Sequence, residues 1–274
     1  MPEGPEIRRA ADQVERAVAD AEIDSVWFAF VRLKQFEKRL RQSRVLRVET
    51  RGKAMLTVFE NDLIIYSHNQ LYGRWIVTAG ANQPQSNRQL RLAIVTKASS
   101  AWLFSASDID VMNRAELSQH PFLRRLGPDL LSQSPDWQEI RDRMDLSEFR
   151  NRALGPLLLD QQFLAGLGNY LRAEILFQSR IDPRSKPKSL CRSARNRLAK
   201  SILSLTRRSY RTGGLTNAPA LVKQLKDSGK TDRESHRFSV YGREGESCYR
   251  CKQTVLRMQS GGRSLYFCPG CQTE

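Results

Sequence analysis

The sequence has few acidic side chains for the number of basic ones. Its 274 residues include 29 Asp and Glu against 45 Lys and Arg, which gives a formal net charge of +16 and a pI near 10.1. A chain this basic attracts polyanions whether or not it recognises their sequence. With 40% hydrophobic and 27% charged residues, it can still bury substantial cores, which argues against disorder as its main state.

Long apolar runs are also missing. No stretch approaches the roughly 18 apolar residues that a membrane-spanning helix needs. The first 20 residues carry eight charges, which is unlike a secretory signal. Internal repeats and low-complexity tracts are absent as well. We therefore expect a cytoplasmic, nucleoid-associated protein that has no membrane partner.

The excess of positive charge is unevenly distributed. Residues 1–180 hold 25 basic and 22 acidic side chains, whereas residues 181–274 hold 20 basic and 7 acidic ones. One interpretation is a solvated basic face with no specific partner. The other is a phosphate-binding part joined to a nearly neutral part that has a different task.

Hydrophobic patterning predicts an α+β chain with several domains. Apolar residues at helical spacing between Ile7 and Val18 indicate an amphipathic N-terminal helix. Seven short β-rich runs follow between Ser25 and Ser105, and such runs favour a sandwich or a barrel. Helical patterns replace them from Leu117 onward. We predict four parts: a β domain over 1–116, a helical domain over 117–211, a linker or mobile loop over 212–236 and a cysteine-containing hairpin over 237–274.

The cysteines have the spacing of a metal site. Four of the five stand in two C-x2-C pairs separated by 16 residues, namely Cys248, Cys251, Cys268 and Cys271. This is the pattern of a four-thiolate zinc site. Two disulfides are the alternative, which the lack of a secretory signal disfavours. Because four thiolates leave no open position for substrate or water, we expect one structural Zn²⁺ ion.

The segment between the two cysteine pairs predicts a β-hairpin. Two β-like runs, Thr254–Met258 and Arg263–Phe267, flank a turn that contains Gly261 and Gly262. A metal ion would then stabilise a hairpin that is too small to have a core of its own. Arg263 directly follows the turn. It is either an ordinary solvated arginine or a guanidinium presented to a phosphate.

A glycine-rich segment precedes one predicted helix. Gly166, Gly168 and Asn169 lead into a helical stretch over Tyr170–Gln178. Glycines followed by an Asn at or near the N-cap leave backbone N–H groups where the helix dipole favours an anion. An ordinary cap on a core helix explains the spacing equally well. The basic surroundings favour a phosphate site.

The N-terminus offers a possible nucleophile. Pro2 follows the initiator Met1, and we expect Met1 to be absent from the active enzyme, which leaves a free prolyl amine able to attack a carbonyl-like carbon. Glu3 stands beside it, and Lys53 lies in a turn between two expected strands. Taken singly, each of these three residues is most simply an ordinary surface side chain.

Together these features resemble a known family. Six segments, in the family's order and spread from Pro2 to Gln272, are similar to the formamidopyrimidine-DNA glycosylase and endonuclease VIII family. They are PEGPEIRRAAD at the N-terminus, ETRGKA around Lys53, YSHNQLYG, HPFLRRLGPD, LLLDQQFLAGLGNYLRAEIL and the terminal CYRC with RSLYFCPGCQ. PEGPE and the triplet Gln70-Leu71-Tyr72 resemble the pyrimidine-lesion branch, that of bacterial endonuclease VIII.

The resemblance implies both a fold and an activity. The fold would be an N-terminal β-sandwich with an N-terminal helix, a helix-two-turn-helix domain and a C-terminal zinc-finger β-hairpin. The activity would be that of a bifunctional DNA glycosylase and AP lyase of base excision repair, which removes oxidised pyrimidines. The partner would be double-stranded DNA containing oxidised bases or abasic sites, bound by a monomer.

The resemblance also implies roles for individual residues. Pro2 would form a Schiff base with the sugar, and Glu3 would be the proton donor. Lys53 would assist β-elimination, and Arg263 would hold phosphate and assist δ-elimination. The residues implied in DNA binding are Gln70, Leu71 and Tyr72, which would fill the hole left by the flipped nucleotide, and Arg125 and Asn169, which would contact the backbone.

Three other functions remain open at this point. The first is the purine-lesion branch of the same family, which acts on 8-oxoguanine and formamidopyrimidines. The second is a non-catalytic zinc protein that binds damaged DNA, which would leave Pro2, Glu3 and Lys53 without a role. The third is an RNA-binding zinc-ribbon protein, which would explain only the C-terminal third of the chain.

Overall fold

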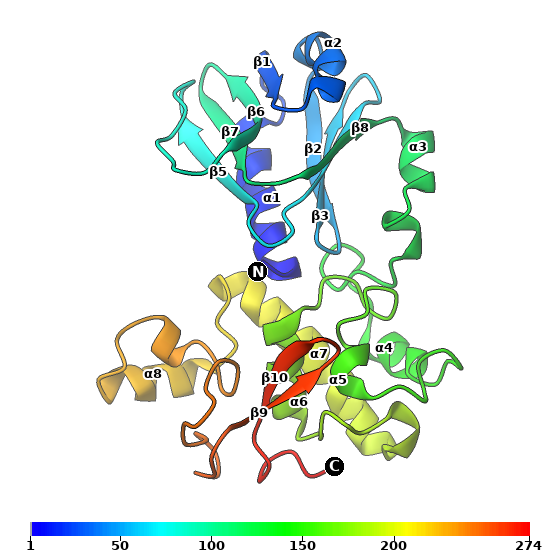
Figure 1. Cartoon of the computed structure of the whole chain (residues 1–274), viewed down its shortest axis with the longest axis vertical. Coiled ribbons are helices and arrows are strands. Elements are labelled where there is room, and N and C mark those ends of the chain that lie inside the picture. Colours follow the sequence, from blue (N-terminus) through cyan, green and yellow to red (C-terminus); the bar gives the residue numbers. More distant parts are fainter. Residues whose placement is uncertain (1) are drawn as a thin grey trace. The chain divides into compact units, whose positions relative to one another are not determined.

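The computed structural model describes residues 2–274, so the expectation that Met1 is removed lies outside the described residues. Contacts divide the chain into two units (Figure 1). Unit 1 runs to Leu126, and unit 2 runs from Gly127 to Glu274. Each unit is described by itself.

Unit 1 is a β-sandwich with a helix in its core. One four-stranded sheet has the order β1-β6-β7-β5 and the other has the order β2-β3-β4-β8, and all pairings are antiparallel. The strands are β1 (Ile23–Phe28), β2 (Val45–Arg51), β3 (Ala54–Phe59), β4 (Ile64–His68), β5 (Arg74–Ala79), β6 (Leu90–Thr96), β7 (Ser99–Phe104) and β8 (Asp108–Met112). The β-sandwich expected from the sequence is confirmed.

The helix α1 (Gly4–Val18) shows why this sequence folds as it does. Its apolar residues recur at helical spacing, and Ile7, Ala11, Val14 and Val18 are buried. They share one core with residues of both sheets, including Ile94 of β6. An amphipathic helix thus covers the inner faces of the two sheets.

The outer face of the β2-β3-β4-β8 sheet is covered as well. The short helices α3 (Arg114–Gln119) and η2 (Leu123–Arg125) bring Leu117 and Leu123 against Leu56 of β3. All six residues of β3 are therefore buried. The remaining short elements of this unit are η1 (Val31–Phe36) and α2 (Glu37–Arg41).

Unit 2 is built around one buried helix. Nine residues of α6 (Asn169–Ser179) are buried, and the helices packed around it include α7 (Arg192–Thr212). The C-terminal hairpin joins the same core, because Leu265 and Phe267 pack with Leu171 of α6. The other elements are α4 (Trp137–Arg143), α5 (Leu154–Leu157), η3 (Pro187–Ser189), α8 (Pro219–Asp227), η4 (Glu234–His236), β9 (Leu256–Ser260) and β10 (Arg263–Phe267).

One expectation needs partial correction. The range 212–236 was expected to be a linker or a mobile loop, but it contains the nine-residue helix α8. Pro219 begins this helix at a position where its missing N–H costs nothing. Leu225 is buried, so the helix has an apolar anchor that its Lys-rich composition conceals.

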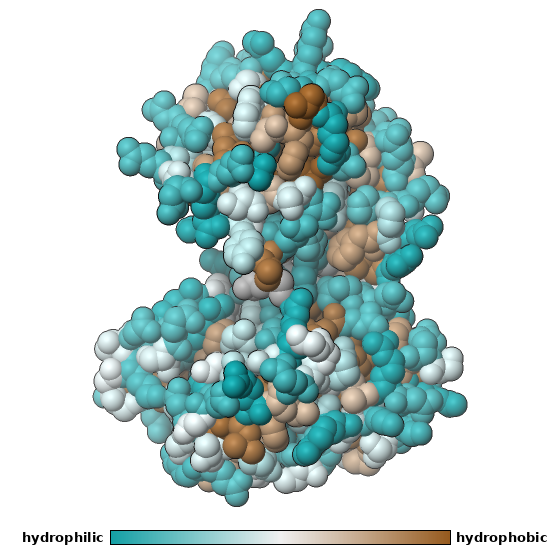
Figure 2. All heavy atoms as spheres, in the orientation of Figure 1, coloured by the Kyte–Doolittle hydropathy of each residue, from teal (hydrophilic) through white to brown (hydrophobic). Residues whose placement is uncertain are grey.

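The face of the molecule drawn in Figure 2 is mostly hydrophilic. Figure 2 shows apolar groups on the visible face only as small patches between hydrophilic ones. None of the helices in residues 2–274 combines the length and the apolar character that crossing a bilayer requires.

Candidate active site

Glu3 and Lys53 lie at the same end of unit 1. The C-terminal end of α1 is beside Val45, where β2 begins. One turn earlier in the helix, the Oε1 atom of Glu15 accepts a hydrogen bond of 2.9 Å from the backbone N–H of Val48, so helix and strand run in opposite directions. Counted from the contact at Val45, α1 extends back about 24 Å to Glu3, and β2 extends forward about 26 Å to Lys53. Both residues therefore reach the same edge of the sandwich, as Figure 1 shows for α1 and the β2–β3 hairpin.

Glu3 is a buried carboxyl residue at a helix N-terminus. It is the N-cap residue of α1 and is only 1% exposed. Its backbone N–H donates to the Oε2 atom of Glu6 at 3.0 Å, which fixes the first turn. Pro2, directly before it, is half-buried. Glutamates are rarely fully buried, so Glu3 is not an ordinary solvated surface acid. Its burial makes it a candidate functional carboxyl group.

Lys53 occupies a tight turn. Arg51 pairs with Ala54, so Gly52 and Lys53 form a two-residue connection between β2 and β3. Gly52 has a φ of 62°, in the left-handed region that such a turn requires and that glycine adopts without strain. Lys53 is half-buried. The turn therefore fixes the backbone that carries the Lys53 amine.

His68 lies beside this lysine, and the sequence did not single it out. It ends β4 and pairs with Ala54 on one side and with Asp108 on the other. Burial lowers the pKa of His68 below its usual value; the Asp108 carboxylate opposes this shift, and the Lys53 ammonium adds to it. The Nδ1 atom of His68 accepts a hydrogen bond of 3.1 Å from the backbone N–H of Gln70, which needs this nitrogen unprotonated.

The segment Gln70–Tyr72, which we call the wedge loop, projects from this same edge. It connects β4 to β5. Leu71 is 57% exposed and Tyr72 is 70% exposed, although an apolar and an aromatic residue next to a turn would ordinarily belong to a core. Two large side chains thus lie at a solvent-exposed tip. Such a tip has the shape that insertion into a base stack needs.

Arg125 also belongs to unit 1. It is the last residue of η2, its side chain is exposed, and its backbone N–H bonds to the carbonyl of Phe122 at 3.3 Å. The structure brings Pro2, Glu3, Lys53 and the wedge loop to one edge of unit 1. Asn169 and Arg263 belong to unit 2.

In unit 2, the helix N-terminus and the hairpin turn meet. Gly168 is the N-cap of α6 and Asn169 is its first residue, which agrees with the prediction that Asn169 lies at or near the cap. The Asn169 side-chain Nδ2 donates to the carbonyl of Ser264 at 3.0 Å. Arg263, the neighbour of Ser264, is exposed at the start of β10. Two segments that the sequence suggested separately as phosphate-binding are therefore joined.

Arg172 holds this junction, and sequence reasoning missed it. Its side chain is fully buried, and its guanidinium donates to the carbonyls of Gly155 and Ser260 at 3.0 Å each and to that of Arg263 at 3.3 Å. Hydrogen bonds from an ionised group to carbonyls are about twice as strong as neutral ones. The turn Gly261-Gly262, with φ angles of 61° and 71°, closes the hairpin as predicted.

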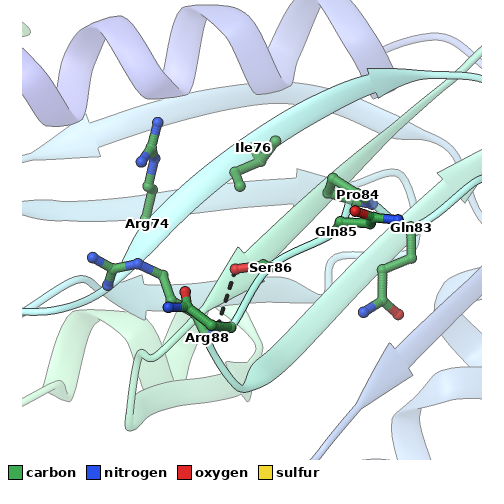
Figure 3. A pocket seen from close by; sticks show the side chains of 8 residues that line it. Arg74, Ile76, Gln83, Pro84, Gln85, Ser86 and Arg88 are labelled. Carbon is green, nitrogen blue, oxygen red and sulfur yellow. Dashed lines mark hydrogen bonds between the residues drawn. The ribbon is translucent and has the colours of Figure 1, made fainter.

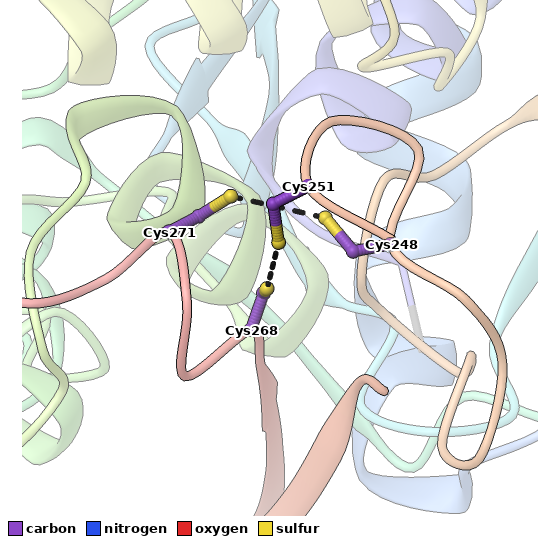
Figure 4. Close-up of side chains that lie close together, drawn as sticks. All are labelled: Cys248, Cys251, Cys268 and Cys271. Carbon is purple, nitrogen blue, oxygen red and sulfur yellow. Dashed lines mark hydrogen bonds between the residues drawn. The ribbon is translucent and has the colours of Figure 1, made fainter. Parts of the chain in front are cut away.

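The cysteine cluster fits a metal ion. The four sulfur atoms lie within 4.8 Å of one another, and the shorter contacts are 3.9 Å between Cys248 and Cys271 and 3.3 Å between Cys251 and Cys268 (Figure 4). Without a cation, burial raises the pKa of Cys268 to about 11 and favours its neutral thiol; four thiolates could lie this close together only if a cation neutralised them. Three of the cysteines pack against Ala173 and Phe177 of α6, which ties the site to the central helix.

Comparisons with known proteins agree with this architecture. Residues 1–106 match the formamidopyrimidine-DNA glycosylase N-terminal domain, and residues 126–218 match the formamidopyrimidine-DNA glycosylase H2TH domain. Solved structures share the fold over the whole chain. One is MutM in complex with DNA containing carbocyclic 8-oxo-G, with a TM-score of 0.80 and 22% identity. Another is Lactococcus lactis Fpg with DNA containing N7-benzyl-Fapy-dG, with a TM-score of 0.81 and 23% identity; each covers 100% of both chains.

Curated relatives are similar in sequence along the entire length. The Endonuclease 8 of Klebsiella pneumoniae is 44% identical over 272 residues, and those of Shigella sonnei and Escherichia coli O6:H1 are 45% identical. In each case the match covers 99% of this chain and 100% of the relative. The fold and the site together define a DNA glycosylase and AP lyase of base excision repair. The chain belongs to the formamidopyrimidine-DNA glycosylase and endonuclease VIII family.

Proposed function

We propose that this enzyme removes oxidised pyrimidines from double-stranded DNA and then cleaves the strand by β,δ-elimination through a Schiff base on Pro2. The observation that carries the proposal is the gathering of Pro2, the buried Glu3, Lys53 and the wedge loop at one edge of unit 1. The name Endonuclease 8 of the curated relatives and the Gln70-Leu71-Tyr72 triplet support the pyrimidine-lesion branch.

The proposed chemistry begins with base loss. The nitrogen of Pro2, free once Met1 is removed, forms a bond to the anomeric carbon of the flipped nucleotide while the N-glycosidic bond breaks. The departing base takes the electron pair of that bond and a proton. Opening of the sugar ring then gives an iminium ion, and the ring oxygen takes a second proton. Glu3 is the proposed proton donor for these transfers.

Strand cleavage follows from the iminium ion. Its positive charge acidifies the neighbouring sugar carbon, so that loss of a proton there expels the 3′ phosphate, a step that Lys53 assists. A second elimination releases the 5′ phosphate with the help of Arg263. The product is a one-nucleotide gap with phosphate on both sides, and water releases Pro2 for the next turnover.

Binding of DNA is proposed to rely on residues of both units. The wedge loop fills the hole left in the base stack, while Arg125, Asn169 and Arg263 hold phosphates. Solved relatives in complex with lesion-containing or abasic DNA support this partner. Cys248, Cys251, Cys268 and Cys271 would hold one Zn²⁺ ion, whose chemistry is purely structural, since four thiolates complete its tetrahedron. We propose that the enzyme acts as a monomer.

Borohydride trapping on a panel of duplexes tests this function. The duplexes carry thymine glycol, 5-hydroxycytosine, 8-oxoguanine or an abasic site, and the covalent adduct is quantified for each. We expect trapping with the abasic site and preferential trapping with the two oxidised pyrimidines. Preference for 8-oxoguanine would instead select purine lesions. If no duplex gives an adduct, the result would favour a non-catalytic DNA-binding protein.

A further inference from the structure

Hydrogen bonds, most of them from residues outside the loop, hold the backbone of the wedge loop in shape. Two large side chains at an exposed tip have no core to order them, so their position depends on hydrogen bonds to the loop's backbone and to Gln70. One such bond comes from within: the backbone N–H of Gly73 donates to the carbonyl of Asn69 at 2.7 Å. A Cβ at Gly73 would lie 2.6 Å from that carbonyl oxygen, so only glycine permits this closure.

The first half of the loop is fastened to its own sheet. The Oγ atom of Ser107 donates to the Oε1 atom of Gln70 at 2.7 Å, and the backbone N–H of Gln70 donates to His68 at 3.1 Å. Both contacts fix Gln70, whose φ of 51° is left-handed and strained for a residue other than glycine. Neither contact reaches the second half of the loop.

The second half is held by Arg88. Its Nη1 atom donates to the carbonyl of Tyr72 at 2.7 Å, which is at the short end of the usual range for such a bond. Arg88 lies in the segment between β5 and β6, where its own backbone N–H bonds to the Oγ atom of Ser86 at 3.1 Å (Figure 3). A charged donor that is itself anchored orders the backbone of the residue whose ring is most exposed.

We propose that Arg88 is a positioning residue for base excision: it pre-orders Tyr72 so that the wedge loop enters duplex DNA without first losing conformational freedom. This inference rests on the proposed function, because it needs the wedge loop to fill the hole in the stack. Arg88 acts on the substrate only through the Tyr72 carbonyl. Its effect is therefore confined to substrates in which a hole must be filled.

Arg74 provides a matched control. It lines the same open pocket of about 930 Å³ as Arg88, and Figure 3 shows both side chains at one end of it. It is exposed and carries the same charge, and among residues 2–274 no hydrogen bond joins its side chain to the wedge loop. Replacing Arg74 thus removes one positive charge from the same neighbourhood and leaves the tether in place.

The experiment compares duplex with single-stranded substrate in the wild type, Arg88→Ala, Arg88→Lys and Arg74→Ala. Single-turnover excision from a thymine glycol duplex is measured beside borohydride trapping on a single-stranded abasic oligonucleotide, which has no hole to fill. We expect Arg88→Ala to slow the duplex reaction about tenfold and the single-stranded reaction less than twofold. Arg74→Ala should leave the ratio of the two rates within about twofold of the wild-type ratio.

Hydrogen–deuterium exchange supplies a second readout that does not require activity. Arg88→Ala should speed amide exchange in residues 69–73, while exchange in β4 and β5 stays unchanged. The inference would be overturned by an equal loss of activity on both substrates, or by a loss that low salt or Arg88→Lys fully restores, since either result favours a direct phosphate contact. Unchanged amide exchange in residues 69–73 would also overturn it and would leave Arg88 without a role in ordering the loop. If the wild type traps no substrate at all, the proposed function fails, and the exchange measurement alone decides whether Arg88 orders the loop.

Discussion

The side chain of Asn169 donates a hydrogen bond of 3.0 Å to the carbonyl of Ser264, 95 residues further along the chain. This bond joins the N-terminus of α6 to the β9–β10 hairpin, which lies between the two cysteine pairs. The N-terminus of α6, the Asn169 amide and the backbone of the neighbouring Arg263 are thus held close together. The phosphate-binding site that we propose there depends on every part that holds the hairpin against the helix.

Arg172 is the most important of those parts. We expect Arg172→Met to lower the free energy of unfolding by about 3 kcal/mol, because several buried carbonyls lose their donor at once. Urea denaturation followed by circular dichroism measures this change. Arg192→Met, at an exposed position at the start of α7, is the control and should alter the stability by less than about 0.5 kcal/mol. Equal effects of the two substitutions would show that the buried guanidinium is not a structural anchor.

The cysteine cluster predicts one bound zinc ion per chain. Metal analysis of purified protein should give this stoichiometry, and Cys268→Ser should reduce it, since three thiolates hold the ion more weakly. Removal of the ion by a chelator should loosen the hairpin, because its core is shared with the metal-bound turns. The control is Cys191→Ser, which changes an exposed cysteine outside the cluster. Metal content that is unaffected by Cys268→Ser would contradict the assignment.

His68 predicts a pH dependence of stability. Its pKa in the folded protein lies below the value near 6.5 expected for the unfolded chain. The unfolded chain therefore binds the proton more readily, and stability that is present above about pH 6.5 is lost as the pH falls toward the folded pKa. NMR titration should show a histidine signal with a depressed pKa that disappears in His68→Gln. A His68 signal that titrates at or above pH 6.5 would disprove the shift.

Glu3 predicts a separation of the two activities. In Glu3→Gln, excision of a thymine glycol base should fall by about 10² to 10⁴, because the proton for the leaving base is lost. Strand cleavage at a preformed abasic site should fall much less, since no base has to leave and the abasic sugar opens to its aldehyde in water without help from Glu3. Gel assays of both substrates with the same enzyme preparation measure the ratio. A parallel loss of both activities would point to a structural role at the start of α1, where Glu3 is the N-cap.

Much of this arrangement was predictable because the signals are local. The cysteine spacing and two consecutive glycines predict the hairpin within a few residues of Leu256–Ser260 and Arg263–Phe267. Alternating apolar residues likewise predict seven strands of unit 1. The strand β8 (Asp108–Met112) was missed because two acidic residues with low β propensity interrupt its pattern.

The remaining features depend on contacts that are distant in sequence. An arginine in a helix suggests a solvated face, and only the approach of Ser260 and Arg263 explains why Arg172 is buried. His68 and Arg88 likewise acquire a role only through the strand pairing and the loop they contact. Sequence patterns indicate which residues have suitable chemistry, but hydrogen bonds across the fold determine which of them are held in place.

The most direct test of the account is to locate the covalent bond in the borohydride-trapped complex. The wild-type enzyme is trapped on a thymine glycol duplex, digested and analysed by mass spectrometry. We predict that the reduced adduct lies on the N-terminal peptide, that this peptide begins at Pro2, and that the mass of intact active protein lacks Met1. An adduct on Lys53 or on any other lysine, or active protein that retains Met1, would contradict the proposed role of Pro2.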